Sequence, residues 1–147
     1  MGTRLQERVE AMAARLVWLP PLLARVTVGV VFIQSGWGKL HHLPSVIEFF
    51  GSLGIPAPQI QAPMVSGIEL LCGALVLAGL LTRLAALPLV GTMVVAILTA
   101  KLKDLTGVFD LFGISEFLYI VLLLWLATAG PGAVSLDRIF GSRTAER

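Results

Sequence analysis

Four long apolar segments, separated by short polar connections, dominate the pattern of hydrophobic and polar positions along this chain. Each has roughly the 17–25 residues that a helix needs to cross the hydrocarbon core of a bilayer. The pattern therefore predicts an all-α polytopic membrane protein in which four transmembrane helices form an antiparallel bundle. We expect these helices over residues 21–38, 62–81, 84–100 and 116–129, with a start as early as Pro58 for the second.

Residues 3–19, which precede the first apolar segment, have the period of an amphipathic helix. Arginines occupy the other sides of this helix. Such a helix can lie in the plane of the lipid headgroups, and a frayed polar tail is the alternative. One face collects the apolar side chains Leu5, Val9, Met12 and Leu16.

The connection between the first two apolar segments, residues 39–61, contains a second amphipathic element. Its centre, residues 46–50, is too apolar for a free loop and too short to span a bilayer. We expect a short helix on the membrane surface, ended by Gly51 or Gly54 before Pro56.

The remaining connections set the domain organisation. Only Thr82 and Arg83 separate the second and third apolar segments, which predicts a tight hairpin, and residues 101–114 read as an ordered surface loop. We expect one domain with two appendages. The divisions are an interfacial helix over residues 1–20, a transmembrane domain over 21–130 and a cytoplasmic tail over 131–147.

The composition agrees with lipid as the surrounding solvent. The chain has 147 residues, of which 56% are hydrophobic and 14% charged, whereas soluble domains carry about 25% charge. Cys72 is the single cysteine, so neither a disulfide framework nor a Cys-x-x-Cys pair exists. The net charge of +2 comes from basic residues that flank the apolar segments instead of clustering, so we expect no nucleic-acid partner.

The distribution of basic residues predicts the orientation. Under the positive-inside rule, the side with more arginine and lysine faces the cytoplasm. Seven basic residues against three place both termini in the cytoplasm of a bacterial inner membrane. The seven are Arg4, Arg8, Arg15, Arg83, Arg138, Arg143 and Arg147, and the three are Lys39, Lys101 and Lys103.

Two charged residues interrupt the apolar segments. A carboxylate at membrane depth costs at least about 2.5 kcal/mol. We therefore expect Glu69 to pair with another group, to bind a proton or to have a functional role. Arg25 carries the opposite charge in the first segment, and we expect it to lie within reach of Glu69. The pair would be either a proton or ligand site inside the bundle or a structural contact that fixes helix register.

Further polar residues lie towards the outer end of the first segment. Gln34 is an amide at lipid depth, which we expect to form hydrogen bonds inside the bundle. Trp37 suits the interface as an anchor. Lys39 either extends to the headgroups or pairs with Glu116 or Glu69 at the mouth of a cavity.

Other residues have simpler interpretations. His41 and His42 are adjacent, so their side chains point about 100° apart on a helix and form a poor metal site; we expect no metal centre. Cys72 is expected to be a small apolar filler. Small residues let membrane helices approach closely, and we expect packing faces at Gly29 and Gly36 of the first segment and at Gly67, Gly73 and Gly79 of the second.

The ordered set of motifs along the chain resembles the DoxX family. Residues 25–40, RVTVGVVFIQSGWGKL, resemble its Arg-led first helix with a final Gly-x-x-Lys-Leu pattern, and residues 50–58, FGSLGIPAP, its Leu-Gly-Ile/Leu-Pro-x-Pro turn. Residues 69–86, ELLCGALVLAGLLTRLAA, resemble its Glu-led second helix and Thr-Arg connection. Glu116 and the closing GPGAVSLDRIF resemble its last helix and tail, so the likeness covers roughly residues 21–140.

This resemblance implies a four-helix membrane fold and a role beside redox chemistry. Members are associated with membrane oxidoreductase assemblies, including quinone-linked sulfur oxidation and systems that handle oxidative or thiol stress. Because the chain carries no redox-active group of its own, we expect a non-catalytic subunit that anchors or assembles an oxidoreductase partner, without an intrinsic cofactor. One alternative is a module that binds a quinone or similar lipophilic molecule, with Glu69 carrying protons. A membrane assembly chaperone, a small transporter and a homo-oligomer are further options.

Overall fold

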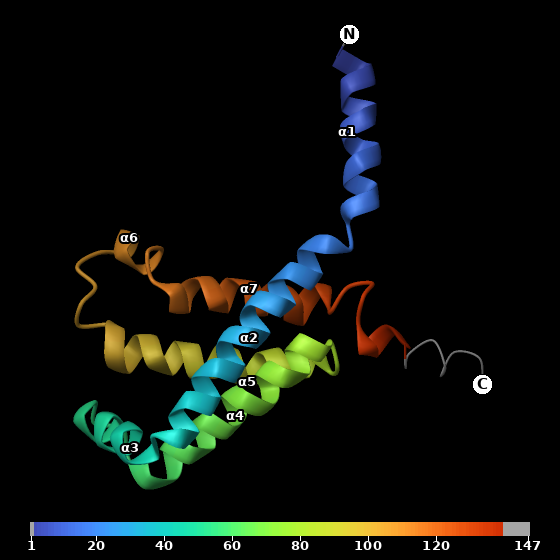
Figure 1. Cartoon of the computed structure of the whole chain (residues 1–147). Helices are drawn as coiled ribbons and strands as arrows, with labels where there is room; N and C mark the ends of the chain where they lie inside the picture. The colour runs from blue at the N-terminus through green and yellow to red at the C-terminus, as the bar shows by residue number, and fades with distance from the viewer. Residues whose placement is uncertain (1, 140–147) are drawn as a thin grey trace.

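The computed structural model of the chain describes residues 2–139, and every regular element in that range is a helix (Figure 1). The prediction of an all-α protein is thereby confirmed. A π-helical turn, η1 (Ile97–Lys101), continues the fifth helix. The helices are α1 (Gly2–Leu16), α2 (Leu19–His41), α3 (Leu43–Ser52), α4 (Pro58–Ala78), α5 (Thr82–Ala96), α6 (Val108–Leu111) and α7 (Ser115–Ala129).

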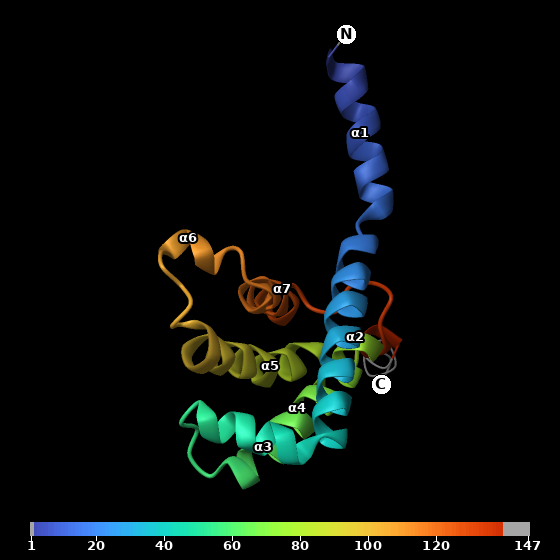
Figure 2. The ribbon, with the colours of Figure 1, turned by 60° about the vertical axis from the view of Figure 1, so that its left-hand side comes forward.

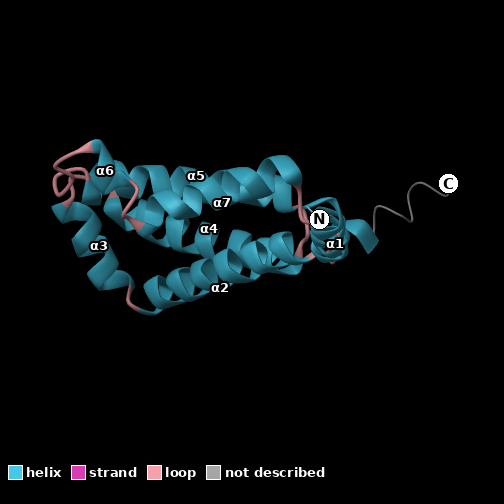
Figure 3. Ribbon diagram, turned by 90° about the horizontal axis from the view of Figure 1, so that it is seen from above, coloured by secondary structure: helices cyan, strands magenta, loops and turns pink. Residues whose placement is uncertain are grey.

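The four long helices pack as two pairs. α2 runs along α4, and α5 runs along α7, while contacts between α4 and α5 join the pairs. Seen from above, the two pairs lie side by side, with α3 across one end (Figure 3). α1 forms the predicted amphipathic helix and projects away from this body, so its described side chains are exposed (Figure 2).

Glycines allow α2 and α4 to approach closely. A Cβ on Gly36 would lie 2.5 Å from the backbone nitrogen of Leu70, and Gly29 and Gly73 are similarly confined by the opposite helix. The small-residue packing face is therefore confirmed at these three positions. Gly67, which we expected on the same face, has open space around it.

The apolar core lies where the two helix pairs meet. Phe32 of α2 is buried and contacts Tyr119 of α7 edge-on, with ring centroids 6.0 Å apart. Cys72 packs partly buried against this core, which agrees with its expected role as a small filler. The buried core residues are Ala24, Val28, Phe32, Val76, Ala85, Ala86, Leu89, Leu123 and Leu126.

Three helices in the described range are long and apolar enough to cross a membrane. They are Leu19–His41 with 23 residues, Pro58–Ala78 with 21, and Thr82–Lys101, which joins α5 to η1, with 20. The second begins at Pro58, the earlier of the two starts that the sequence allowed. The fourth predicted segment forms an apolar helix of 15 residues, about 22 Å long.

The turn between α4 and α5 lies earlier than predicted. The sequence placed it at Thr82 and Arg83, but the backbone turns at Gly79 and Leu81, which both adopt left-handed conformations, and Thr82 already begins α5. Glycine at a helix C-terminus adopts this conformation without steric cost. Asp137 then accepts hydrogen bonds from the backbone N–H groups of Leu81 and Thr82, at 2.8 and 3.2 Å.

Both connecting regions contain short helices. The predicted surface helix around residues 46–50 is present as α3, which ends at Ser52. The ordered loop over 101–114 contains α6, and Asp110 accepts hydrogen bonds from the hydroxyl and N–H of Thr106 and from the N–H of Gly107. These hydrogen bonds, with the Thr106 hydroxyl the largest contributor, lower the pKa of the Asp110 carboxyl below its ordinary value.

Candidate functional site

The buried carboxylate Glu69 is held by two residues of α2. Lys39 Nζ lies 2.6 and 2.7 Å from the two carboxylate oxygens, and Ser35 Oγ donates to Oε2 at 2.9 Å. Glu69 is only 1% exposed, so this ion pair and hydrogen bond replace the water that the carboxylate has lost. Pairing of Lys39 with Glu69, one of the arrangements expected from the sequence, is therefore present.

The position of this cluster follows from the glycine contact between the helices. Gly36 packs on the backbone of Ser66 and Leu70, so α2 and α4 approach closely beside Glu69. Ser35 and Lys39 are one helical turn apart and share a face. Together these features direct a hydroxyl and an ammonium group at the same carboxylate.

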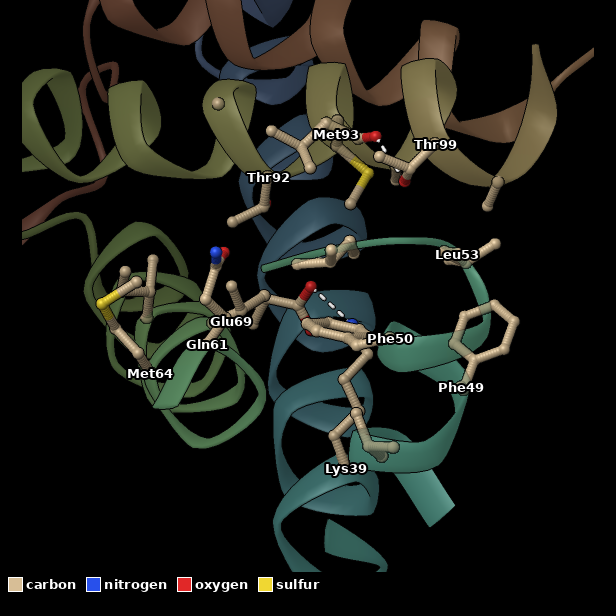
Figure 4. Close-up of a pocket in the computed structure, with 18 of the residues that line it drawn as sticks. Lys39, Phe49, Phe50, Leu53, Gln61, Met64, Glu69, Thr92, Met93 and Thr99 are labelled. Carbon is tan, nitrogen blue, oxygen red and sulfur yellow. Dashed lines mark hydrogen bonds and ion pairs between the residues drawn. The ribbon is translucent and has the colours of Figure 1, made fainter. Parts of the chain in front are cut away.

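A pocket of about 540 Å³ opens beside the ion pair (Figure 4). Lys39 and Glu69 are its charged lining residues, and most of the remaining wall is apolar. A volume of this size lies within the range of small-molecule sites, about 300–1,000 Å³. The wall consists of Lys39 from α2; Ser45, Val46, Phe49 and Phe50 from α3; Leu53 and Ile55; Gln61, Met64, Val65, Ile68 and Glu69 from α4; Pro88, Gly91, Thr92, Met93, Val95 and Ala96 from α5; and Thr99 and Ala100 from η1.

Sequence reasoning did not foresee how α3 contributes to this pocket. The helix contributes Val46 and Phe50 to the wall. Gln61 donates from its side-chain amide to the carbonyl of Pro56 at 2.8 Å, which ties the segment after α3 to the start of α4. The apolar face of α3, which we expected to rest on the membrane surface, thus covers the side of the pocket.

Arg25 does not pair with Glu69, and the expectation that it would is wrong. Its guanidinium donates to the carbonyl of Pro131 at 2.9 Å. A Cβ on Gly79 would collide with the guanidinium, so the absence of a side chain there makes room for it. Asp137, which caps α5, also attracts this charge.

The helix register explains the error. Gly36 lies level with Leu70, and Gly29 lies level with Leu77, so Arg25 falls near Gly79. Arg25 is about ten residues before Ser35, which corresponds to about 15 Å along α2. Arg25 is therefore too far from Glu69 along the helices for the contact that we expected. Arg25 is buried at 2% exposure, but it joins the closing segment to the α4–α5 turn and lies outside the pocket.

The remaining predicted site residues lie apart from the pocket. Gln34 is exposed and forms no hydrogen bond with any described residue, so the expectation that it bonds inside the bundle is wrong. Glu116 lies 3.9 Å from Lys101 instead of contacting Lys39. Trp37 is 58% exposed, with its ring centroid 4.4 Å from that of His41. Of the five predicted cluster residues, the structure joins only Lys39 and Glu69.

The two histidines are exposed and each contacts the preceding helical turn. His41 Nδ1 donates to the carbonyl of Trp37 at 2.9 Å, and His42 Nδ1 donates to that of Gly38 at 3.0 Å. Within residues 2–139, no three His, Cys, Asp or Glu side chains are arranged to hold a metal ion.

The sequence did not reveal two contacts, that of Ser35 with Glu69 and that of Asp137 with the start of α5. Ser35 was not singled out, although its place four residues before Lys39 puts both on one helix face, which is the signal that would have found it. Asp137 lies in the closing Ser-Leu-Asp motif, but nothing in the sequence alone identifies the distant helix that it caps.

Comparisons with known proteins agree with a membrane protein of this type. The DoxX family model matches residues 21–102. The chain is 37% identical over 118 residues to a Bacillus subtilis protein named "Putative oxidoreductase CatD", covering 79% of this chain and 83% of that protein. It is 38% identical over 140 residues to an uncharacterized membrane protein of Mycobacterium tuberculosis, covering 84% of each.

A further relative is the inner membrane protein YphA of Escherichia coli, which is 35% identical over 133 residues. The match covers 86% of this chain and 92% of the relative. No solved structure matches the chain. The names of the Mycobacterium tuberculosis and Escherichia coli relatives describe membrane proteins, one of them a protein of the inner membrane.

Proposed function

Because the chain belongs to the DoxX family of membrane proteins, we propose that it is a membrane subunit that binds a lipophilic molecule with a polar head, of the quinone class, beside a partner oxidoreductase. The observation that carries this proposal is the pocket whose wall contains the buried Lys39–Glu69 pair. The name of the Bacillus subtilis relative gives it further support.

The residues of the pocket fit such a ligand. A quinone combines a ring with two carbonyl oxygens and an apolar tail. The ammonium group of Lys39 is the donor for a carbonyl oxygen, and its side chain is 31% exposed, whereas the Glu69 side chain is 1% exposed. Phe50, Met93 and Ile68 supply apolar surface for a ring or a tail. Buried apolar walls with a few directed polar groups are typical of small-molecule sites.

Glu69 is the proton-carrying residue of this proposal. Reduction of a quinone takes up two electrons and two protons. Glu69 lies against Lys39 and Ser35 at the wall of the pocket, so it is the acidic group placed to pass a proton to a bound ring. The electrons come from the partner oxidoreductase, since the single cysteine of this chain permits no dithiol exchange within it.

The membrane arrangement that we propose has four antiparallel crossings in a bacterial inner membrane. The Escherichia coli relative carries the name of an inner membrane protein, which supports the compartment. α7 is the fourth and shortest crossing. Cytoplasmic termini are favoured by the arginines on that side of the membrane, which are Arg4, Arg8 and Arg15 of α1, Arg83 and Arg138. Two members of that count, Arg143 and Arg147, lie outside the described residues. We retain 1–20, 21–130 and 131–147 as the divisions of the chain.

Filling the pocket tests this function directly. Gly91 lines the pocket and a Cβ there would meet nothing within 4 Å, so Gly91→Leu adds a bulky side chain at the pocket wall without a clash of its Cβ. Gly67→Leu is the matched control, because Gly67 also has open space but does not line the pocket. We expect a short-tailed quinone analogue to bind the wild type and the control in lipid nanodiscs and to lose affinity for Gly91→Leu. Absence of binding to the folded wild type would contradict the proposal.

A second function, anchoring of the partner, has a specific observation in its favour. The short helix α6 and the residue that follows it present Val108, Phe109 and Phe112, which are 74%, 90% and 67% exposed. Exposed apolar patches often mark protein or membrane contacts. Gentle extraction of the wild type should bring down a stoichiometric oxidoreductase, and Phe109→Ser should weaken this association without changing quinone affinity. Unchanged recovery of the partner would exclude α6 as the docking surface.

A further inference from the structure

The side of α2 that faces away from the bundle carries a regular stripe of exposed residues. Leu23, Thr27, Val30, Gln34 and Trp37 follow each other at intervals of four, three, four and three residues. This spacing places all of them on one face of the helix. The opposite face of α2, with Val28, Gly29, Phe32 and Gly36, packs inside the bundle. The outward stripe therefore has no covering element among the described residues.

Gln34 is the residue on this stripe whose hydrogen-bonding groups find no partner in lipid tails. Its amide forms no hydrogen bond with any described side chain or backbone group. It lies seven residues before the end of α2 at His41, about 10 Å inside that end, so it falls within a hydrocarbon core about 30 Å thick. An unsatisfied amide in an apolar environment is costly, and interhelical hydrogen bonds are the usual remedy in membranes.

We propose that the outward stripe of α2 is a homodimer interface, in which Gln34 of one copy forms hydrogen bonds with Gln34 of a second copy. The side-chain amide has both a donor and an acceptor, so two of them related by a two-fold axis satisfy each other. The four-three spacing is that of helices that cross at about 20° in membrane bundles. Thr27 lies one heptad before Gln34 and continues the polar line along the same seam.

A second copy fits this face better than other occupants. The stripe has no charged residue between Leu23 and Trp37, so a partner with a charged surface gains nothing there. A lipid tail covers the leucine and valine but leaves the amide unpaired. Neither Lys39 nor Glu69 belongs to the stripe, so the dimer leaves the pocket open. The inference therefore stands apart from the proposed function.

Association in lipid tests the inference. The full-length protein, labelled with donor and acceptor dyes, is reconstituted at a series of protein-to-lipid ratios, and energy transfer gives the association constant. Gln34→Leu is expected to lower this constant about three- to thirty-fold, the range for loss of a pair of interhelical hydrogen bonds. Gln59→Leu is the matched control, because it makes the same change at an exposed position of α4 outside the stripe. A protein that stays monomeric at every ratio, or equal constants for Gln34→Leu and wild type, would overturn the interface.

Disulfide cross-linking provides a second test that does not depend on the leucine variant. In a Cys72→Ala background, Gln34→Cys places one thiol on the stripe, whereas Leu71→Cys places one on an exposed part of α4, another side of the bundle. We expect mild oxidation in membranes to yield a covalent dimer from Gln34→Cys and far less from Leu71→Cys. Preferential cross-linking through Leu71→Cys, or a cross-link from Gln34→Cys to a different protein, would show that a second copy does not cover this face.

Discussion

Lys39 and Glu69 are thirty residues apart in the chain, yet the ammonium group lies 2.6 and 2.7 Å from the two carboxylate oxygens. The contact joins α2 to α4 at the wall of the pocket. Its two members differ in access, because the Glu69 side chain is 1% exposed and that of Lys39 is 31% exposed. The carboxylate is therefore the member that depends on the pair, and Lys39 is the member that a ligand can reach.

Removal of Lys39 should destabilise the protein. Lys39→Leu leaves Glu69 buried with only the Ser35 hydroxyl, and loss of one member of a buried pair costs about 3–5 kcal/mol. We expect a loss of about 3 kcal/mol, at the low end because Lys39 is partly exposed. Denaturant unfolding in detergent micelles measures it. The double variant Lys39→Leu, Glu69→Leu should recover most of the loss, and a double variant less stable than the single one would argue against this reasoning.

The glycine contact between α2 and α4 should tolerate no side chain. Gly36→Ala places a Cβ 2.5 Å from the Leu70 nitrogen and 2.6 Å from the Ser66 carbonyl, which are backbone atoms that cannot turn aside. We expect a loss of about 1–3 kcal/mol of unfolding free energy. Gly38→Ala, two positions along the same helix, meets nothing and should be neutral or stabilising by up to about 1 kcal/mol. Equal effects of the two changes would show that the helices do not pack in this register.

We expect Arg25 to have a structural role and to take no part in ligand binding. Arg25→Met removes the hydrogen bond to Pro131 and the charge beside Asp137, so the segment over residues 131–139 loses a point of attachment. We expect faster amide hydrogen exchange in that segment and at the start of α5, with quinone affinity unchanged. Asp137→Asn should act at the same place and cost about 1 kcal/mol, as loss of a helix cap does. A fall in quinone affinity for Arg25→Met would instead place Arg25 in the ligand site.

We expect the stability of the loop that contains α6 to depend on pH through Asp110. Three donors lower the pKa of this carboxyl in the folded protein, so its contribution to loop stability is present above the ordinary pKa. That contribution is lost as the pH falls from the ordinary value through the lower folded value. Carbon-detected NMR titration should find this pKa below its usual range, and Thr106→Val should raise it, because the hydroxyl is the largest contributor. A pKa that Thr106→Val leaves unchanged would contradict the hydrogen-bond account.

The hydrophobic pattern was sufficient to predict the helices, because each long apolar segment has few conformations open to it in lipid. It also located the small-residue face of α2, since Gly29 and Gly36 share one side of that helix. The turn at Gly79 was missed because Thr82 and Arg83 are the polar residues at that point. The backbone turns instead where a left-handed conformation is available, and the polar pair begins α5.

The partner of Glu69 was harder to predict, because helix register depends on contacts that sequence periodicity does not contain. Arg25 and Lys39 both lie on α2, about 21 Å apart along the helix, and the register decides which of them meets the carboxylate. The direction of Gln34 was predicted wrongly for a different reason. An amide in an apolar segment was assumed to face the chain's own bundle, whereas the structure directs it outward. The pocket also needed α3, whose position depends on the turn before α4.

The most direct test of the account is the affinity of a short-tailed quinone analogue for Glu69→Gln in lipid nanodiscs. Glutamine keeps the shape but removes the charge and one of the two acceptor oxygens that face Lys39. Lys39 can extend towards the headgroups, so the fold should persist. We predict at least a tenfold loss of affinity, about 1.4 kcal/mol, with Glu116→Gln, a carboxylate outside the pocket, binding like the wild type. Equal affinity for wild type, Glu69→Gln and Glu116→Gln would contradict the claim that the Lys39–Glu69 pair is the polar contact of a ligand site.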